Sequence, residues 1–395
     1  MIDDREWMTS LAEATFWICS GLIVYVYAIY PAVIWFCSRC WGRRRPAPEI
    51  GDDELPTLTL LIAAHNEQQV IGARLENALA VDYPREKLRI VVASDGSTDQ
   101  TTAIVRHFAS RGVTLLDFTP NRGKAAALNA AWRHLTSDIV VLSDANTWID
   151  PSAPRRLARW FLSPAVEVVC GRLLLVDPQT GRNADGLYWR YETFLKSCEA
   201  RLGAMLGANG AIYAVRRTAY LPIPRDTIID DFVIPLRISL NRNSVLLYDE
   251  EAVASEETPP EIRDEFRRRV RIGAGGFQSL KLLWPLLDPR FGWLAFSFAS
   301  HKLLRWLCPF FLLGELTANL CLCRDSTYLA LFVAQWAFVA LSIGGARRSG
   351  QGLAVRLARL SAMFSAMNLA LLLGFFRWLG GGQGGAWTPT TRAPQ

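Results

Sequence analysis

Apolar residues follow two different patterns along this 395-residue chain. Long uninterrupted apolar runs lie near both ends, while the middle alternates short apolar runs with helical patterns. A helix needs about 20 mostly apolar residues to cross a bilayer of about 30 Å. Pro31 lies inside the first long run and is expected to kink it. We expect membrane spans at residues 14–38, 306–322, 326–345 and 360–376.

The charges beside these runs are unequal and predict an orientation. The first run follows an acidic stretch and precedes an arginine cluster that begins at Arg39. Because Lys and Arg favour the cytoplasmic side of a membrane, we expect residues 39–305 in the cytoplasm and a multi-pass protein in the inner (cytoplasmic) membrane. A cleavable signal peptide would begin with its positive end, so we interpret the first run as an anchor. The loop between the last two runs agrees with this orientation and carries Arg347, Arg348, Arg356 and Arg359.

The middle of the chain predicts a parallel sheet. Strand-like apolar runs cover residues 57–64, 88–93, 113–118 and 139–142, and a helical pattern follows each of the first three. Strands that alternate with helices over this spacing form right-handed βαβ units. In such a sheet, ligands sit at the carboxyl ends of the strands. The polar residues after each run are therefore the candidates for binding.

Those polar residues suit a nucleotide diphosphate and a divalent ion. Asp95 follows the second run beside a glycine, where a carboxylate can bind a ribose or a base edge. Lys124 opens a helix, whose first N–H groups favour phosphate. Asp144 and Asn146 follow the fourth run and offer oxygen ligands for Mg²⁺ or Mn²⁺. The structural alternative is that Asp144 caps the next helix or forms a turn with its own backbone.

Other common nucleotide and metal sites are disfavoured. No G-x-G-x-x-G follows the first run and no G-x-x-x-x-G-K-[ST] is present, so neither a dinucleotide cofactor nor a P-loop is expected. Most of the eight cysteines lie in apolar runs and predict no disulfide framework. The net charge of +6 suits nucleic acid, membrane lipid or phosphate-bearing substrates. We expect the last two and no nucleic-acid partner.

Four motifs in order give a more specific indication. The strand ends carry Ala-Ala-His-Asn-Glu, Ser-Asp-Gly-Ser-Thr-Asp and Ser-Asp-Ala-Asn-Thr, and Arg-Gly-Lys-Ala-Ala-Ala-Leu-Asn opens a helix. Together they resemble the family 2 glycosyltransferases of the GT-A fold over about residues 55–285, and the membrane-bound, cellulose-synthase-like branch in particular. The resemblance implies an α/β fold: a Rossmann-like nucleotide-diphospho-sugar transferase domain with one N-terminal and three C-terminal transmembrane helices.

The resemblance implies roles for the residues of these motifs. Ala64 and Glu67 would border the uridine of the donor, and Asp95 would meet the uracil or the ribose. Lys124 would lie near the diphosphate. Asp144 would be the first acid of the family's D-x-D metal motif. Asn146 stands in place of the second acid and is a weaker ligand without charge.

Later motifs supply a catalytic base and an acceptor loop. Asp230 and Asp231 match the last two positions of the family's T-E-D, so Asp231 would be the base and Asp230 would replace the Glu. The alternative is that they cap the following helix. Asn209 and Gly210 lie in a stretch of small residues that the resemblance assigns to sugar or acceptor binding, with an ordinary tight turn as the alternative.

An arginine-rich stretch precedes the C-terminal runs. Residues 261–281 combine arginines with apolar residues at helical spacing and predict an amphipathic interfacial helix. Arg268 and Arg271 in it could hold lipid phosphates or the donor diphosphate. The family's processive members carry Q-x-x-R-W here; Arg271 matches the Arg, but Ile272 replaces the Trp and the Gln is absent. This difference favours a lipid or short-glycan acceptor, whereas the family's use in exopolysaccharide assembly favours a polymer.

The patterns and the resemblance together predict an inverting glycosyltransferase. It would move a sugar from a nucleotide-sugar donor, a UDP-sugar first of all, to a polysaccharide or lipid-linked acceptor. A catalytically lapsed membrane scaffold or transport subunit is the alternative. The predicted regions are an anchor (1–45), a cytoplasmic GT-A domain (46–260), an amphipathic segment (261–300), three transmembrane helices (301–380) and a disordered tail (381–395).

Overall fold

The computed structural model describes residues 4–43, 45–177, 183, 186–241, 244–257, 262–345 and 352–381. The predicted tail lies outside these residues except for Gly381, as do Arg44, Arg347 and Arg348. The chain divides into two compact units. The described residues of Met1–Val33, Glu265–Phe277 and Ala299–Gly381 form the helical unit, and those of Ile34–Asp264 and Gln278–Phe298 form the sheet unit.

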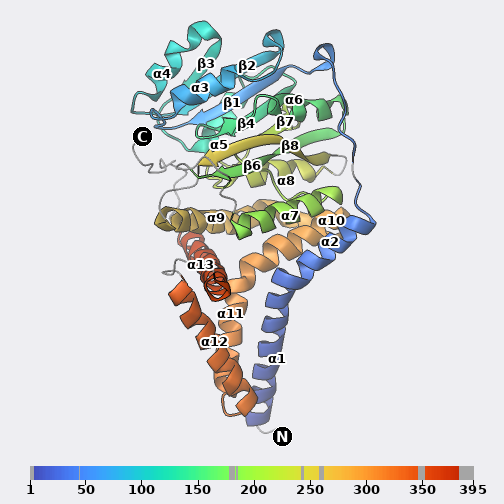
Figure 1. Cartoon of the computed structure of the whole chain (residues 1–395), viewed down its shortest axis with the longest axis vertical. Helices are drawn as coiled ribbons and strands as arrows, with labels where there is room; N and C mark the ends of the chain where they lie inside the picture. The colour runs from blue at the N-terminus through green and yellow to red at the C-terminus, as the bar shows by residue number, and fades with distance from the viewer. Residues whose placement is uncertain are drawn as a thin grey trace. The chain divides into compact units, whose positions relative to one another are not determined.

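One sheet of eight strands forms the centre of the sheet unit (Figure 1). Among the described residues its order is β3-β2-β1-β4-β7-β6-β8-β5. β1 is buried along its whole length, because it pairs with a strand on each side and helices cover both faces of the sheet. The strands are β1 (Leu58–Ala64), β2 (Leu88–Asp95), β3 (Val113–Phe118), β4 (Ile139–Asp144), β5 (Trp148–Ile149), β6 (Val166–Val176), β7 (Tyr213–Arg216) and β8 (Val245–Glu257).

The first four strands confirm the predicted parallel half of the sheet. β1 pairs in parallel with both β2 and β4, and β3 pairs in parallel with β2. In this register Ala63 lies opposite Asp144, and Ala64 lies opposite Ser94. The carboxyl ends of these strands therefore meet along one edge of the sheet, and the loops that leave this edge carry the predicted site residues.

The other half of the sheet lies beyond the four predicted strands and contains both antiparallel and parallel pairs. β7 is antiparallel to β4 and β6 is antiparallel to β7, while β6 and β8 are parallel. β8 contains Asp249, Glu250 and Glu251 near its middle, and its register with β6 shifts there. Such a strand lacks the uninterrupted apolar run by which a buried strand is recognised in a sequence. The sheet is therefore mixed.

Helices lie on both faces of this sheet (Figure 1). α3 (Ile71–Leu79), α4 (Thr101–His107) and α6 (Ala153–Ala158) share one buried core with β1, β2 and β4. α5 (Lys124–Trp132) contacts β1 and β2, and Figure 1 shows it on the face opposite α3. Further helices of this unit are α7 (Leu187–Arg201), α8 (Asp230–Ser239) and α10 (Trp293–Ser297).

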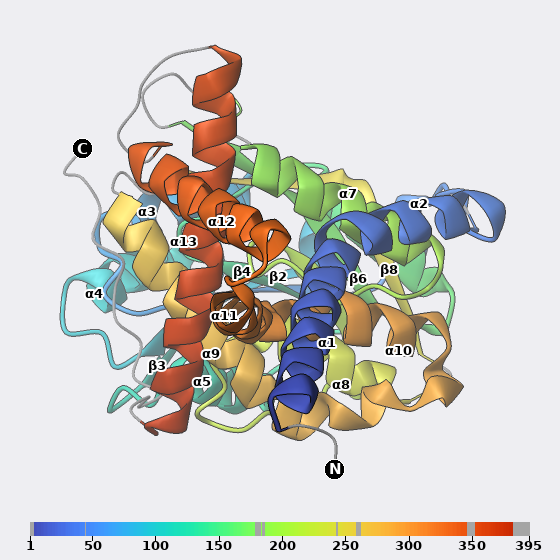
Figure 2. The same cartoon turned by 90° about the horizontal axis from the view of Figure 1, so that it is seen from below.

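Long helices make up most of the helical unit. α11 lies between α1 and α13 (Figure 2). Three described helical stretches are long and apolar enough to cross a membrane: Glu6–Cys40, Ser326–Gly345 and Leu353–Leu379. α11 is not among them, and it carries Arg305 and Glu315 within 19 residues. The long helices are α1 (Asp4–Val24), α11 (Leu304–Leu322), α12 (Ser326–Gly345) and α13 (Leu353–Leu379).

The first predicted span is one continuous but irregular helix. α1 passes through a π-helical segment, Tyr25–Ile29, into α2 (Tyr30–Cys40). Pro31 lies two residues after this segment and has no N–H to donate to the preceding turn, which accounts for a departure from regular α-helix near this place. Before this segment, in α1, Ser20 Oγ donates a hydrogen bond to Glu315 Oε1 of α11 (2.8 Å). The carboxyl of this apolar helix is thus paired with a neighbouring helix.

Candidate active site

Asp144 ends strand β4 and faces Lys124, the first residue of α5. Lys124 Nζ lies 2.7 Å from Asp144 Oδ1 and 3.3 Å from Asp230 Oδ1. The Asp144 side chain is 27% exposed and that of Lys124 is 22% exposed, so the pair is partly buried. The turn after Asp144 uses its backbone carbonyl, which accepts from Thr147 N–H (3.3 Å). The carboxylate itself therefore pairs with a cation, and the structural alternative of a side-chain cap is not observed.

Asp230 and Asp231 are the first two residues of α8. The N-cap of this helix is Ile229, which makes no side-chain cap hydrogen bond, so neither aspartate caps the helix. Asp230 is 6% exposed and pairs with Lys124, whereas Asp231 is partly exposed. Of these two carboxylates, Asp231 is the one that an acceptor can reach.

Gly210 brings the predicted acceptor loop against these aspartates. Its N–H donates to Asp231 Oδ2 (3.0 Å), and the Ala208 N–H donates to the Asp231 carbonyl (2.8 Å). A Cβ on Gly210 would lie 3.2 Å from Asp144 Oδ2 and 3.5 Å from Asp231 Oδ2. A side chain at this position would crowd the Asp144 carboxylate, so the close approach of the loop favours glycine.

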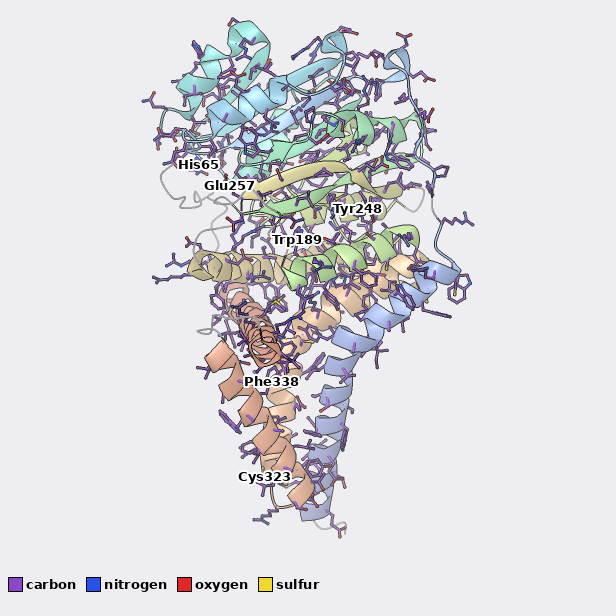
Figure 3. All side chains as sticks on the ribbon, in the orientation of Figure 1. His65, Trp189, Tyr248, Glu257, Cys323 and Phe338 are labelled. Carbon is purple, nitrogen blue, oxygen red and sulfur yellow. The ribbon has the colours of Figure 1, made fainter. Side chains whose placement is uncertain are left out.

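Asn209 is used to hold this loop. Its Nδ2 donates to the Gly171 carbonyl oxygen (3.0 Å), and its Oδ1 accepts from Lys196 Nζ of α7 (2.8 Å). Lys196 also lies over the ring of Tyr248, 5.9 Å from its centroid; Figure 3 marks this tyrosine. Both ends of the Asn209 amide are therefore bonded within the protein. Its contact with a sugar or an acceptor stays a prediction.

Hydrogen bonds join the loops that follow β1 and β2. Asp95 is fully buried, and its two carboxylate oxygens accept from the N–H groups of Arg122 (2.9 Å) and Gly123 (2.7 Å). His65 Nδ1 donates to the Asp95 carbonyl oxygen (2.7 Å), and Asn121 Nδ2 donates to His65 Nε2 (3.1 Å). Asp95 therefore anchors the loop that leads into α5. A contact of its carboxylate with uracil or ribose would require this loop to move, and it stays a prediction.

Ala64 and Glu67 lie next to these loops. Ala64 is the last residue of β1 and has no exposed surface, and Glu67 is 8% exposed. The Glu67 N–H donates to Thr101 Oγ1 (2.8 Å), and the Glu67 carbonyl accepts from the N–H of Ile71 (2.9 Å). The Glu67 backbone thus connects β1 to the starts of α3 and α4. The contact of Ala64 and Glu67 with uridine stays a prediction.

A buried arginine that was not predicted from the sequence lies beneath Asp144. Arg74 of α3 is 2% exposed; its Nε donates to the Asp144 carbonyl oxygen (3.4 Å) and its Nη2 to Ser143 Oγ (3.2 Å). Burial lowers the pKa of its guanidinium to about 9, and the nearby Asp144 charge opposes this shift. A signal was present, because Arg74 lies three residues after Ile71 and four before Ala78, on the apolar face of the predicted helix.

A buried tyrosine near the three aspartates was also missed. Tyr213 of β7 pairs with Leu142, two residues before Asp144, so it lies on the face of the sheet to which Asp144 belongs. It is fully buried, and its hydroxyl has no hydrogen-bond partner in the part of the chain that the structure describes. Burial, together with the charges of Asp230 and Asp231, raises the pKa of this hydroxyl. No sequence signal separates it from an ordinary core tyrosine.

Gln278 was missed as well, and it holds the segment that leads into α8. Its Nε2 donates to the Asp226 carbonyl oxygen (2.8 Å), and its Oε1 accepts from the N–H of Ile228 (3.1 Å). Together with a third hydrogen bond, from Nε2 to Asp226 Oδ2 (3.1 Å), these contacts of one amide fix a stretch that has no regular structure of its own. This contact joins residues far apart in the chain, so a sequence pattern does not reveal it.

Three carboxylates surround one ammonium in this cluster. Burial alone would lower the pKa of Lys124, but the charges of Asp144 and Asp230 raise it, so the ammonium keeps its proton. Burial raises the pKa of Asp230 to about 6, and the Lys124 charge limits the rise. With Asp231 included, the cluster remains negative and suits a further cation.

The residues present fit a divalent ion that also binds substrate phosphate. The described residues contain no group of three or more His, Cys, Asp or Glu side chains that could hold a metal. Asp144 and Asn146 offer oxygens, and the Asn146 side chain makes no hydrogen bond to any other described residue. The Lys124 ammonium shows that a cation is held at the Asp144 carboxylate. One carboxylate, one amide oxygen and substrate phosphates are a suitable set for Mg²⁺ or Mn²⁺.

Arg268 and Arg271 belong to α9 (Ile262–Leu283), in the part of that helix that lies in the helical unit. α9 forms over the predicted amphipathic stretch. Both arginines are exposed, and Arg268 Nη1 lies 3.7 Å from Glu265 Oε2 on the same helix. Their contact with a diphosphate or with lipid stays a prediction.

Comparison with known proteins identifies the family. The glycosyl transferase family 2 model matches residues 59–218, and the glycosyl transferase family group 2 model matches residues 139–346, which is more than half of the chain. The chain belongs to glycosyl transferase family group 2. The match confirms the resemblance carried by the strand-end motifs, and it includes the loops of Lys124, Asp144 and Gly210 in one or both models.

Curated relatives are similar to part of this family 2 chain. Poly-beta-1,6-N-acetyl-D-glucosamine synthase of Staphylococcus aureus (strain COL) is 28% identical over 246 residues, which are 59% of this chain and 58% of the relative. The synthase of the same name from Staphylococcus epidermidis (strain ATCC 35984) is 25% identical over 247 residues, again 59% and 58%. The chain thus spans about three-fifths of the length of these relatives.

A solved structure is similar over nearly the whole chain. A mannosyltransferase from Pyrobaculum calidifontis, in complex with GDP-Man and Mn²⁺, has a TM-score of 0.70 and 21% identity. The similarity covers 94% of this chain and 99% of that one. It confirms the predicted α/β GT-A fold with attached apolar helices.

Proposed function

We propose that this chain is an inverting glycosyltransferase, embedded in a membrane, that moves a sugar from a nucleotide-sugar donor to a polysaccharide or lipid-linked acceptor. One observation carries the proposal. Lys124 contacts Asp144, and Gly210 lies against both Asp144 and Asp231, although these groups come from four separate segments of the chain. The closeness of a lysine and two aspartates supports their proposed roles in binding phosphate, holding a metal ion and acting as the base.

Asp231 is the catalytic base in this proposal. Its Oδ2 is held by the Gly210 N–H, and its side chain is partly exposed. It takes the proton from the acceptor hydroxyl while that oxygen bonds to the anomeric carbon of the donor sugar. The bond from this carbon to the diphosphate breaks on the opposite face, and the nucleoside diphosphate leaves with the electron pair. Such a leaving group needs no proton, so one carboxylate suffices, whereas glycoside hydrolysis uses two.

The phosphate end of the proposed site is built from α5 and β4. Lys124 and the first N–H groups of α5 bind the diphosphate. A divalent ion held by Asp144 and Asn146 would neutralise the charge that develops on the leaving group. Asp230 lies 3.3 Å from the Lys124 ammonium and keeps it oriented.

The relatives guide the choice of substrates. The staphylococcal relatives are named as synthases of an N-acetyl-D-glucosamine polymer, which supports a polysaccharide acceptor. The P. calidifontis enzyme is solved with GDP-Man and Mn²⁺, which supports a nucleotide-diphosphate donor and a divalent ion. Ile272, in place of the family's Trp, favours a short or lipid-linked product. We propose a UDP-sugar as the donor to test first and GDP-mannose second.

The charge distribution supports an orientation in the inner membrane with the sheet unit on the cytoplasmic side. Nucleotide sugars would then reach the site from the cytoplasm. The exposed Arg268 and Arg271 of α9 would contact the donor diphosphate or lipid phosphates.

Nucleotide release by the full-length protein in lipid nanodiscs tests the proposal. We expect release of UDP or GDP from one of UDP-glucose, UDP-N-acetylglucosamine and GDP-mannose in the presence of Mn²⁺ or Mg²⁺, with membrane lipid extract as the acceptor source. Asp231→Asn should lower this rate by about 10²- to 10⁴-fold, the usual contribution of a general base. The asparagine oxygen can still accept from the Gly210 N–H, so the fold should be kept.

Asp53→Asn is the matched control, because Asp53 is an exposed aspartate of the sheet unit. It should release nucleotide at the wild-type rate. Equal rates for Asp231→Asn and the wild type would show that the base is another group. Absence of release with every donor would favour a lapsed scaffold or transport subunit.

A further inference from the structure

Lys124 stands where the metal motif would place a cation. Its Nζ lies 2.7 Å from Oδ1 of Asp144, the single acid of the Asp144-Ala-Asn146 motif. The other oxygen of that carboxylate, Oδ2, faces Gly210, where a Cβ would lie 3.2 Å away. Gly210 thus approaches Oδ2 closely, and Oδ1 is the oxygen that pairs with Lys124.

Within the Asp144-Ala-Asn146 motif itself, the Lys124 charge offsets the Asp144 charge, and the remaining negative charge of the cluster lies on Asp230 and Asp231. Asp144 carries one negative charge, Asn146 carries none and Lys124 carries one positive charge. A divalent ion that enters the free protein must compete with an ammonium for one carboxylate and is repelled by it at short range. A diphosphate changes this balance, because it adds negative charge and offers charged oxygens to the ammonium.

We propose that Lys124 holds the place of the divalent ion in the free protein and exchanges Asp144 for the donor diphosphate when the donor binds. The ion then binds together with the nucleotide and only weakly without it. This inference rests on the proposed function. Asp230 makes the exchange feasible, because it is 6% exposed and lies 3.3 Å from Lys124 Nζ. The ammonium can leave Asp144 and still keep one buried carboxylate partner.

Mn²⁺ binding, followed by the loss of the free-ion EPR signal, tests this exchange on the full-length protein in nanodiscs. We expect weak binding by the wild type alone and binding at least about tenfold tighter with UDP or GDP. Lys124→Met should bind Mn²⁺ without nucleotide about 10- to 100-fold more tightly than the wild type, the effect of removing one charge-assisted contact. It should also gain less from the nucleotide. Linkage requires Mn²⁺ to tighten UDP binding by the same factor, which checks each titration.

Two further lysine variants sharpen the test. Lys124→Arg keeps a cation beside Asp144 and should bind nucleotide-free Mn²⁺ as weakly as the wild type. Lys196→Met removes a lysine that pairs with Asn209 and should leave nucleotide-free Mn²⁺ binding unchanged. Asn146→Asp leaves Lys124 in place but adds a charge, so it should tighten nucleotide-free binding and keep a response to UDP.

The outcomes separate this inference from the proposed function. Tight Mn²⁺ binding by the wild type without nucleotide would overturn the inference, and this measurement does not depend on any variant folding. The same holds if Lys124→Met, with a wild-type melting temperature, binds no more tightly than the wild type. If Mn²⁺ fails to bind even with UDP and GDP, the proposed metal-dependent donor site itself is wrong.

Discussion

The two ends of the candidate site differ in how their polar groups are satisfied. At the end formed by the loops after β1 and β2, the groups bond to one another. Both oxygens of Asp95 accept backbone N–H groups, and His65 connects the Asp95 carbonyl to Asn121. The result is a buried network of neutral donors around one carboxylate. Such a network fixes the shape of the loops.

The other end of the site, around Lys124, holds several charged groups with fewer hydrogen bonds among them. Lys124 is shared by Asp144 and Asp230, and Asp231 is held by one backbone N–H. The hydroxyl of Tyr213 is buried nearby and has no hydrogen-bond partner in the described part of the chain. These charged side chains are incompletely paired before substrate binds, and groups of the substrate can then pair with them. We therefore infer that the first end fixes the shape of the loops and that the second end carries the chemistry.

Among the changes that test this difference between the two ends, we expect the largest effect, a loss of activity, from Asp144→Ala. The change removes a ligand of the proposed ion. It also removes the nearest partner of Lys124, because Lys124 Nζ lies 2.7 Å from Asp144 Oδ1. We expect nucleotide release to fall by at least about 10³-fold, since electrostatic stabilisation of a leaving group is worth several kcal/mol. Release of UDP or GDP in the same nanodisc assay measures it.

Asp117→Ala is the control for this change. Asp117 lies near the carboxyl end of β3 and pairs with the exposed Arg106 (2.7 Å), a kind of pair that contributes little. It should keep near-wild-type release. If Asp144→Ala were as active as Asp117→Ala, the residues 143–147 would have a structural role, and the division of the site into shape and chemistry would fail.

The parallel half of the fold and its loops could be predicted from the sequence. Strands buried on both faces produce uninterrupted apolar runs, and β3 has the bounds that its run predicts. The parallel arrangement then brings strand ends to one edge, so that Asp144 and Lys124 could be placed near each other before any contact was known. The family's motifs added Asp231 and Gly210, which the structure brings into contact.

The rest of the site depends on contacts that no local pattern shows. β7 and the irregular β8 carry short or interrupted apolar runs, so the sequence did not predict how the mixed half of the sheet pairs. By residue type, Arg74 resembles a surface residue and Tyr213 resembles a core residue. Arg74 gains its role from burial against Asp144, and Tyr213 from burial against the strand of Asp144. The contact of Asp95 with the nucleotide stays a prediction, and the hydrogen bonds of its carboxylate to the next loop could not be predicted.

A smaller effect, on stability rather than chemistry, is expected for Asp95→Asn. Asparagine offers one oxygen to the two N–H groups of Arg122 and Gly123, and its NH₂ group then faces a buried donor. One buried donor left without a partner costs about 1–3 kcal/mol. Thermal unfolding in nanodiscs should show a lower melting temperature than in Asp117→Asn, an exposed control. An unchanged melting temperature would mean that this end of the site is not held together by Asp95.

The smallest effect expected is a pH dependence of stability that comes from Asp230. Burial raises its pKa from 3.8 to about 6 against the pull of Lys124. Between these values the folded protein holds a proton that the unfolded chain has lost, so the free energy of unfolding falls as the pH rises through this window and levels off above it. Asp230→Asn removes this contribution. The stability of the wild type relative to the variant should therefore decrease from pH 4 to pH 6 in thermal unfolding. A relative stability that increases over this range would mean that the ion pair with Lys124 outweighs burial. The charged end of the site would then be as fully satisfied before substrate binds as the end around Asp95.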